Sequence, residues 1–132
     1  MECREQAERF VLRERFQVPP GGKVTRTLSF AKKLTGKGVR VIALGKSAPK
    51  KLSAALSVPS SGRLFSVDED YDWGSEEWRD IRAPNLFPAA GVWTVEFKND
   101  SPFTPARVDG FAVEVYGYSL DQCQTATPRA GE

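Results

Sequence analysis

Histidine is absent from the 132-residue sequence, which also contains only two cysteines and one methionine. Without histidine, the Ser-His-Asp and Cys-His arrangements of nucleophilic catalysis cannot be built in their usual form. Two cysteines and no histidine are too few ligands for an ordinary structural or catalytic zinc site. The missing residue types therefore argue against the commonest hydrolase and zinc-protein classes.

Long apolar runs are also missing. The longest, "VIALG" at 41–45, is far too short to cross a bilayer, so no membrane span is expected. The first residues, "MECREQAERF", carry charges where a signal peptide needs an apolar stretch. Either the protein is cytoplasmic or an export signal is missing from the chain.

The two cysteines, Cys3 and Cys123, lie near opposite ends of the chain. They would pair in an oxidising compartment if the terminal segments lie side by side. Two unrelated reduced thiols, or a lipid-modified Cys3, are the alternatives. Cysteine usage leans toward a secreted, periplasmic or cell-surface protein.

Composition predicts one globular domain. Hydrophobic residues make up 40% and charged residues 27% of the chain, which is ordinary for a folded protein. A chain of this length buries a core without help from a metal or a disulfide. We expect a single domain over residues 8–120, with a loose N-terminal segment at 1–7 and a loose C-terminal tail at 121–132.

Period-two alternation of apolar and polar residues predicts seven or so strands. In the last of them, Val113 and Val115 face inward, and Glu114, Tyr116 and Tyr118 face outward. The single helical stretch expected is a turn or two at 75–81. The fold class is therefore all-β: an antiparallel β-sandwich, of jelly-roll type, with at most one short helical turn. The strands are expected at about 8–18, 23–30, 38–45, 51–58, 63–67, 89–100 and 108–118.

Two segments resemble a known family. "LSAALSVPSSG" at 52–62 is similar to the L-x-I-x-L-x-S-P-x-G-T stretch of the P domain of proprotein convertases and of related domains in secreted bacterial proteins. "GVWTVEFKND" followed by "ARVDGFAVEV" resembles the end of the same domain. The chain departs from that pattern at three positions, Lys51, Ala106 and Phe111, where the family often has Asp, Gly and Trp.

The resemblance implies a non-catalytic module rather than an enzyme. In the convertases this domain packs against a subtilisin-like protease domain and supports its folding and regulation. The bacterial relatives accompany secreted hydrolases or surface proteins. A protein partner is therefore expected for this chain, on another chain or in another part of a longer one.

The most acidic stretch is "VDEDYDWGSEEWRD" at 67–80. Asp68, Asp70 and Asp72 occupy alternate positions and supply the oxygen ligands that calcium prefers. The spacing is not that of an EF-hand. A solvated acidic loop is the alternative to a calcium site.

The same loop offers contact residues for a partner or a glycan, namely Tyr71, Trp73, Trp78, Glu76 and Glu77. Exposed aromatics beside carboxylates stack on sugar rings or anchor a protein. Alternatively, Trp73 and Trp78 fold back to cap the sandwich, and Trp78 is the more core-like of the two. A carbohydrate-binding module is therefore the second functional hypothesis, and a small carboxylate-based hydrolase is the third.

Positive charge is concentrated in the first half of the chain. Between Phe16 and Val67 there is no Asp or Glu, whereas ten Lys and Arg residues lie there. This polarity would steer an anionic polymer, or the acidic loop of a neighbouring copy, toward the surface. Nucleic-acid binding is not expected, because aromatic and Gly-rich RNA-binding signatures are missing.

Overall fold

The computed structural model describes residues 4–44, 52–58, 62–68, 71, 73 and 77–119. Within these ranges there is no helix, and the expected all-β fold is confirmed. Ten strands are present: β1 (Glu5–Leu12), β2 (Phe16–Val18), β3 (Lys23–Phe30), β4 (Leu34–Ala43), β5 (Leu52–Val58), β6 (Arg63–Val67), β7 (Arg79–Pro88), β8 (Gly91–Asn99), β9 (Ala106–Val108) and β10 (Phe111–Ser119).

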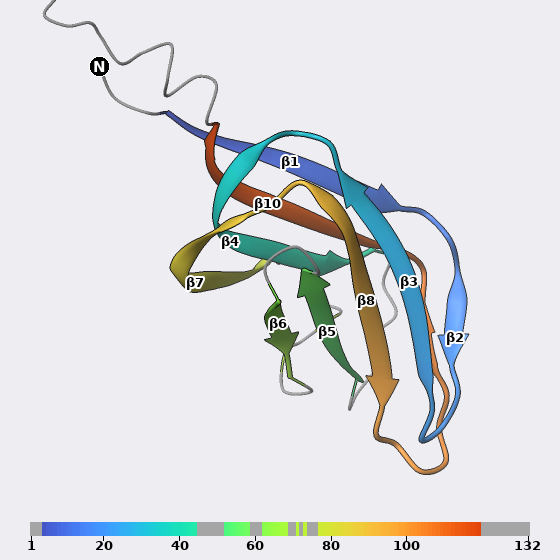
Figure 1. Cartoon of the computed structure of the whole chain (residues 1–132). Coiled ribbons are helices and arrows are strands. Elements are labelled where there is room, and N and C mark those ends of the chain that lie inside the picture. The colour runs from blue at the N-terminus through green and yellow to red at the C-terminus, as the bar shows by residue number, and fades with distance from the viewer. Residues whose placement is uncertain are drawn as a thin grey trace, which may run out of the picture.

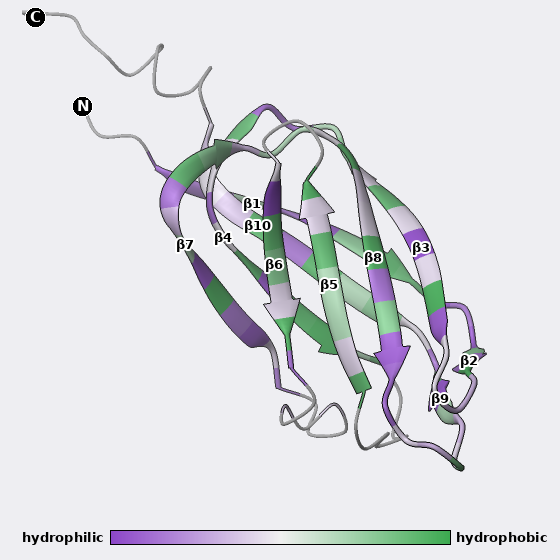
Figure 2. Cartoon of the chain, turned by 60° about the horizontal axis from the view of Figure 1, so that its bottom comes forward, coloured by the Kyte–Doolittle hydropathy of each residue, from purple (hydrophilic) through white to green (hydrophobic). Residues whose placement is uncertain are grey.

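The strands form two main antiparallel sheets that face each other as a sandwich (Figure 1). One has the order β1-β10-β4-β7 and is called the β10 sheet. The other has the order β3-β8-β5-β6 and is called the β8 sheet. Strands β2 and β9 pair separately. Apolar and polar residues alternate along most strands (Figure 2), so each sheet turns one face to the core and one to solvent.

The core contains the residues that the alternation places inward. Leu52, Ala54, Leu56 and Val58 of β5 are all buried, as expected. Trp93 is fully buried, with its ring 4.9 Å from that of Phe30 and its Nε1 donating a hydrogen bond to the Ala89 carbonyl at 2.9 Å. The interpretation of Trp93 as a core residue is confirmed.

The N-terminal strand differs from the prediction in two ways. The expected strand over 8–18 is interrupted at residues 13–15, and its two parts join different partners, β10 and β9. Strand β1 begins at Glu5, so residues 5–7 are not loose. They are ordered because Glu5 pairs with Tyr118 and Ala7 with Tyr116 along β10.

The predicted helical turn at 75–81 is wrong for its described part. Strand β7 begins at Arg79, where Arg79 pairs with Val41 and Ile81 pairs with Val39 of β4. Pairing with the buried strand β4 provides hydrogen-bond partners for the backbone N–H and C=O groups of this segment. Such tertiary context overrides a weak local helix propensity.

Tyr116 faces outward as predicted but is only 2% exposed. A Cβ at Gly38 would lie 2.4 Å from the Tyr116 hydroxyl, which shows that the phenol lies across β4 at a position without a side chain. The Arg40 guanidinium covers the ring from 4.0 Å. Neighbouring side chains, rather than the core, therefore bury this tyrosine.

Candidate protein-binding surface

Trp73 lies in the core. Its side chain is 1% exposed, its Nε1 donates to the Leu52 carbonyl at 2.8 Å, and its ring packs edge-on against Phe97 at 5.9 Å. The prediction that Trp73 contacts a ligand at the surface is therefore wrong, and its alternative, a tryptophan folded back onto the sandwich, is correct. The carbohydrate-binding hypothesis loses its main stacking residue.

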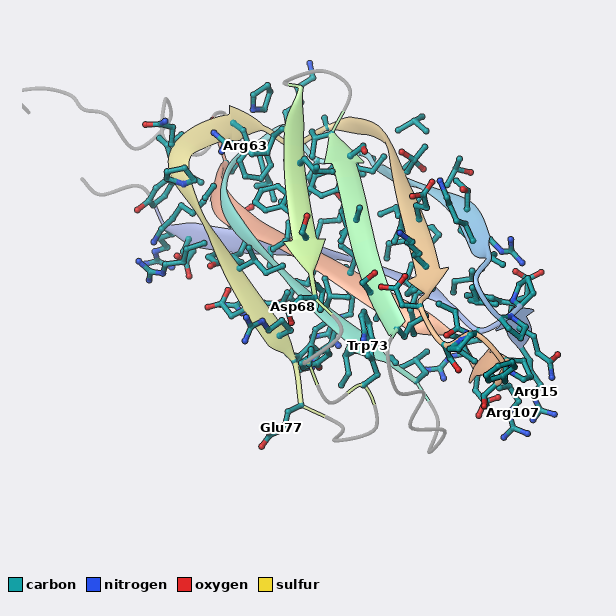
Figure 3. All side chains as sticks on the ribbon, turned by 90° about the horizontal axis from the view of Figure 1, so that it is seen from below. Arg15, Arg63, Asp68, Trp73, Glu77 and Arg107 are labelled. Carbon is teal, nitrogen blue, oxygen red and sulfur yellow. The ribbon has the colours of Figure 1, made fainter. Side chains whose placement is uncertain are left out.

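Tyr71 packs against this tryptophan and bonds to the backbone of Asp68 and Glu77. The Tyr71 ring is half-buried and lies 5.0 Å from the Trp73 ring. Its hydroxyl donates to the Glu77 carbonyl, and its amide donates to the Asp68 carbonyl at 3.3 Å. The exposed Glu77 side chain points away from the sandwich (Figure 3).

The predicted calcium ligands are only partly within the described residues. Asp68 is exposed just after β6, whereas Asp70, Asp72 and Glu76 lie outside the described ranges, as do Cys3 and Cys123. Among the described residues, no group of three Asp, Glu or Cys side chains could hold a metal. Calcium binding and the disulfide stay predictions. A thermal melt tests the first, because a metal that binds only the folded state raises the midpoint.

Trp78 lies on the outer face of the β10 sheet and is half-exposed. The Arg9 guanidinium sits 4.6 Å from the centre of its ring. Arg9 belongs to β1 at one edge of the sheet, and Trp78 immediately precedes β7 at the other. The indole and the guanidinium therefore meet over the sheet, which reverses the expectation that Trp78 is the more core-like tryptophan.

A row of charged side chains crosses the same face. Arg9, Glu114, Arg40 and Asp80 are direct cross-strand partners on β1, β10, β4 and β7. The two Glu114 oxygens accept from different arginines: Oε2 from Arg9 Nη2 at 3.0 Å and Oε1 from Arg40 Nη1 at 2.8 Å. Because the Glu114 side chain is only 15% exposed, these bonds are better shielded than ordinary surface ion pairs.

Tyr116 joins this row to the edge strand. Its hydroxyl donates to Asp80 Oδ1 at 2.7 Å. Burial raises the pKa of Tyr116, and the hydrogen bond to Asp80 raises it further, because the carboxylate favours the neutral phenol. We define the charged face as the set Arg9, Arg40, Trp78, Asp80, Glu114 and Tyr116.

The charged face has the composition of an interaction surface. Trp and Arg are among the residue types that dominate binding energy at protein interfaces, and Trp78, Arg9 and Arg40 are each at least partly exposed. Cross-strand bonds already restrict the two arginines, so less side-chain freedom is lost on binding. Alternation along the last strand predicts that Glu114 faces outward, but the sequence contains no signal for the register that aligns Glu114 with Arg9 and Arg40.

No protein-family model and no curated protein matches this chain. Solved structures do match. The complex of the Aeromonas sobria serine protease with its chaperone ORF2 gives a TM-score of 0.65 at 11% identity, over 89% of this chain and 27% of the matched chain. The same protease alone gives 0.58 at 14% identity, over 89% of this chain and 28% of that one.

A third structure, FlhE, gives a TM-score of 0.58 at 14% identity, over 86% of this chain and 97% of FlhE. At these identities the matches establish a shared fold. This chain spans about a quarter of the matched chain in the protease complex but almost all of FlhE. The same β-sandwich therefore occurs both within a longer chain and by itself.

Among the described residues of this chain, no helix is long and apolar enough to span a membrane.

Proposed function

We propose that this chain is a non-catalytic, P-domain-like module that binds a protein partner outside the cytoplasm or on a cell surface. Its fold is shared with part of a serine protease chain. This chain covers 27% of the matched chain in the complex and 28% of the protease solved alone. Such similar fractions are expected if the same segment of the protease is matched in both structures. The P-domain-like sequence segments and these matches thus support the same kind of partner, a serine protease domain.

The observation that carries the proposal is the Trp78 indole under the Arg9 guanidinium, on a sheet face fixed by Glu114. A half-exposed tryptophan in a restrained position presents a large apolar area at little entropic cost. The charges beside it, two arginines and two carboxylates, select among partners by complementarity. Such a face favours recognition of a folded protein surface.

The first step of the test is to examine the reading frames that flank the one encoding this chain. A subtilisin-like protease found there, or on the same longer chain, is purified and titrated calorimetrically with this chain. Trp78→Ala is expected to weaken binding at least about tenfold, as a truncated central aromatic does. The matched control is Thr94→Ala on the outer face of the β8 sheet, which should leave the dissociation constant unchanged.

Three results count against the proposal. Equal loss of affinity in the Trp78 and Thr94 variants would remove the charged face from the interaction. Binding by the wild-type chain that is unaffected by Trp78→Ala and Arg9→Ala would do the same. Turnover of any peptide or glycoside substrate by the purified chain would overturn the non-catalytic assignment.

A further inference from the structure

The most exposed large apolar side chain of the described residues is Phe103, which is 88% exposed. It lies in the loop over residues 100–105 that connects β8 to β9. This loop extends past the strand ends, at the opposite end of the sandwich from the start of β1 and the end of β10 (Figure 1). Because this ring is almost wholly in water, its apolar area is available for burial against another surface.

The loop is held rigidly by Asn99, the only buried polar residue among the described ones. Asn99 Nδ2 donates to the carbonyls of Val18 at 3.1 Å and Thr104 at 2.8 Å. Its Oδ1 accepts from the Ser101 amide at 3.0 Å, and the Ser101 carbonyl accepts from the Gly21 amide at 3.0 Å. The backbone around Phe103 is therefore preorganised, which lowers the entropic cost of binding through this ring.

An apolar pocket lies at the other end of the molecule. Its volume is about 360 Å³, and its lining includes Lys33, Leu34, Leu86, Phe87, Pro88 and Ala89. The pocket forms where β7 loses its regular pairing with β4, between Arg82 and Phe87. Phe87 turns inward over Gly36, while Leu86 stays 58% exposed.

The pocket and the phenyl ring are complementary in size and chemistry. A dry apolar cavity of about 150 Å³ is enough to bind benzene, so this pocket has room for the Phe103 ring. Of the residues that line the pocket, only Lys33 is charged. In residues 100–105 the only charged residue is Asp100. Asp100 Oδ1 lies 3.6 Å from Lys98 Nζ in an exposed ion pair, and its side chain is 44% exposed. Such a pair is weak, so the carboxylate can also face Lys33 of a second copy, whose charge is opposite in sign.

Phe103 cannot reach the pocket of its own chain. Ala89 and Ala90 of the pocket precede β8, whereas the loop follows it. The nine residues of β8 separate the two by about 30 Å, at roughly 3.3 Å per residue. Contact between the ring and the pocket is therefore possible only between two copies.

We propose that Phe103 of one copy inserts into the Leu34–Leu86–Phe87 pocket of a second copy, which makes a head-to-tail contact. The surfaces are different on the two partners, so the contact is heterologous and propagates into rows unless the rotation closes a ring. One inserted side chain gives a weak contact, so assembly depends on concentration. The contact involves neither Trp78 nor Arg9, and it stands independently of the proposed function.

The test uses the full chain in reducing buffer, so that Cys3 and Cys123 cannot link copies. Sedimentation velocity over a wide concentration range should show the wild type growing beyond the dimer. Phe103→Ala removes the ring, and Leu86→Trp fills the pocket, so each variant should remain monomeric. Leu64→Ala, at a 59% exposed position on β6, is the matched control and should assemble like the wild type.

Mixing the two variants makes the test specific. The Leu86→Trp chain keeps its ring and the Phe103→Ala chain keeps its pocket, so the mixture should form dimers that do not grow. If Leu86→Trp lowers the melting temperature, Lys33→Asp and Asp100→Lys replace it: each should weaken assembly, and the double variant should restore it.

A wild-type chain that stays monomeric at all concentrations would overturn the proposal, as would assembly that survives Phe103→Ala. Failure of the mixture to dimerise would also count against it. Binding of the monomeric wild type to anionic phospholipid vesicles, lost in Phe103→Ala, would assign the ring to a lipid surface instead.

Discussion

The two outer faces of the sandwich are built on the same strand geometry but differ in chemistry. Across the β10 sheet, one row of cross-strand partners is Arg9, Glu114, Arg40 and Asp80. Across the β8 sheet, the comparable row is Thr27, Thr94, Ser57 and Leu64. The long charged side chains of the first row reach the neighbouring strands and bond to each other. The short hydroxyl side chains of the second row stay over their own strands. The charged face is therefore tied together by cross-strand bonds, whereas the outer face of the β8 sheet, which we call the hydroxyl face, carries short hydroxyl side chains and the exposed Leu64 and Val92.

The largest expected effect lies in the core that both sheets share. Trp93→Ala should lower the free energy of unfolding by about 3–5 kcal/mol, because a fully buried indole leaves a cavity. Trp73→Ala should cost a similar amount, since Trp73 is 1% exposed. Urea denaturation measures both. A loss below about 1.5 kcal/mol for Trp73 would mean that its segment is not packed as described.

The second prediction compares the stability contributions of the two faces. It uses a matched pair of glutamates, each on a central strand of its sheet. Glu114→Ala should destabilise by about 1–3 kcal/mol, because two arginines lose a shielded acceptor. Glu96→Ala, on the hydroxyl face, should change stability by no more than about 0.5 kcal/mol. Urea denaturation at low and high salt measures both. Equal losses would erase the proposed difference between the faces.

The third effect concerns alkaline pH. The pKa of Tyr116 is raised in the folded state by burial and by its bond to Asp80. Its contribution to stability is therefore complete below the unfolded pKa of about 10 and is lost as the pH rises through the folded value. Tyr116→Phe should be less stable than the wild type by about 1 kcal/mol at pH 8. That difference should shrink in chemical denaturation above pH 10, and a constant difference would contradict the assignment.

The smallest effect is expected on the hydroxyl face. Thr94→Val keeps the β-branched shape and removes one hydroxyl, so the free energy of unfolding should change by less than about 0.5 kcal/mol. Chemical denaturation is again the measurement. A loss above about 1 kcal/mol would reveal a hydrogen-bond network on this face and make it a competitor for partner binding.

Much of the strand pattern was predictable because burial on one side leaves a period-two signal. Strand β5 shows this clearly, with alternate residues buried along its length. Strand β7 was missed because "RDIRAPNLFP" has two prolines and little alternation; it is a strand through its pairing with β4. The roles of Trp73 and Trp78 were reversed for a related reason. Both tryptophans lie in one acidic stretch, and only the packing of Trp73 against Leu52 and Phe97 separates them.

The sequence by itself determined the all-β class, the inward residues of most strands and the burial of Trp93, since these depend on local alternation. The tertiary structure decided which strands became neighbours. Arg9 and Glu114 are 105 positions apart, and they meet because β1 pairs with β10 in one register. The same holds for Phe103 and the Leu86 pocket, whose places at opposite ends follow from the direction of β8. Long-range pairing sets these positions, because its energy is gained only when distant segments meet.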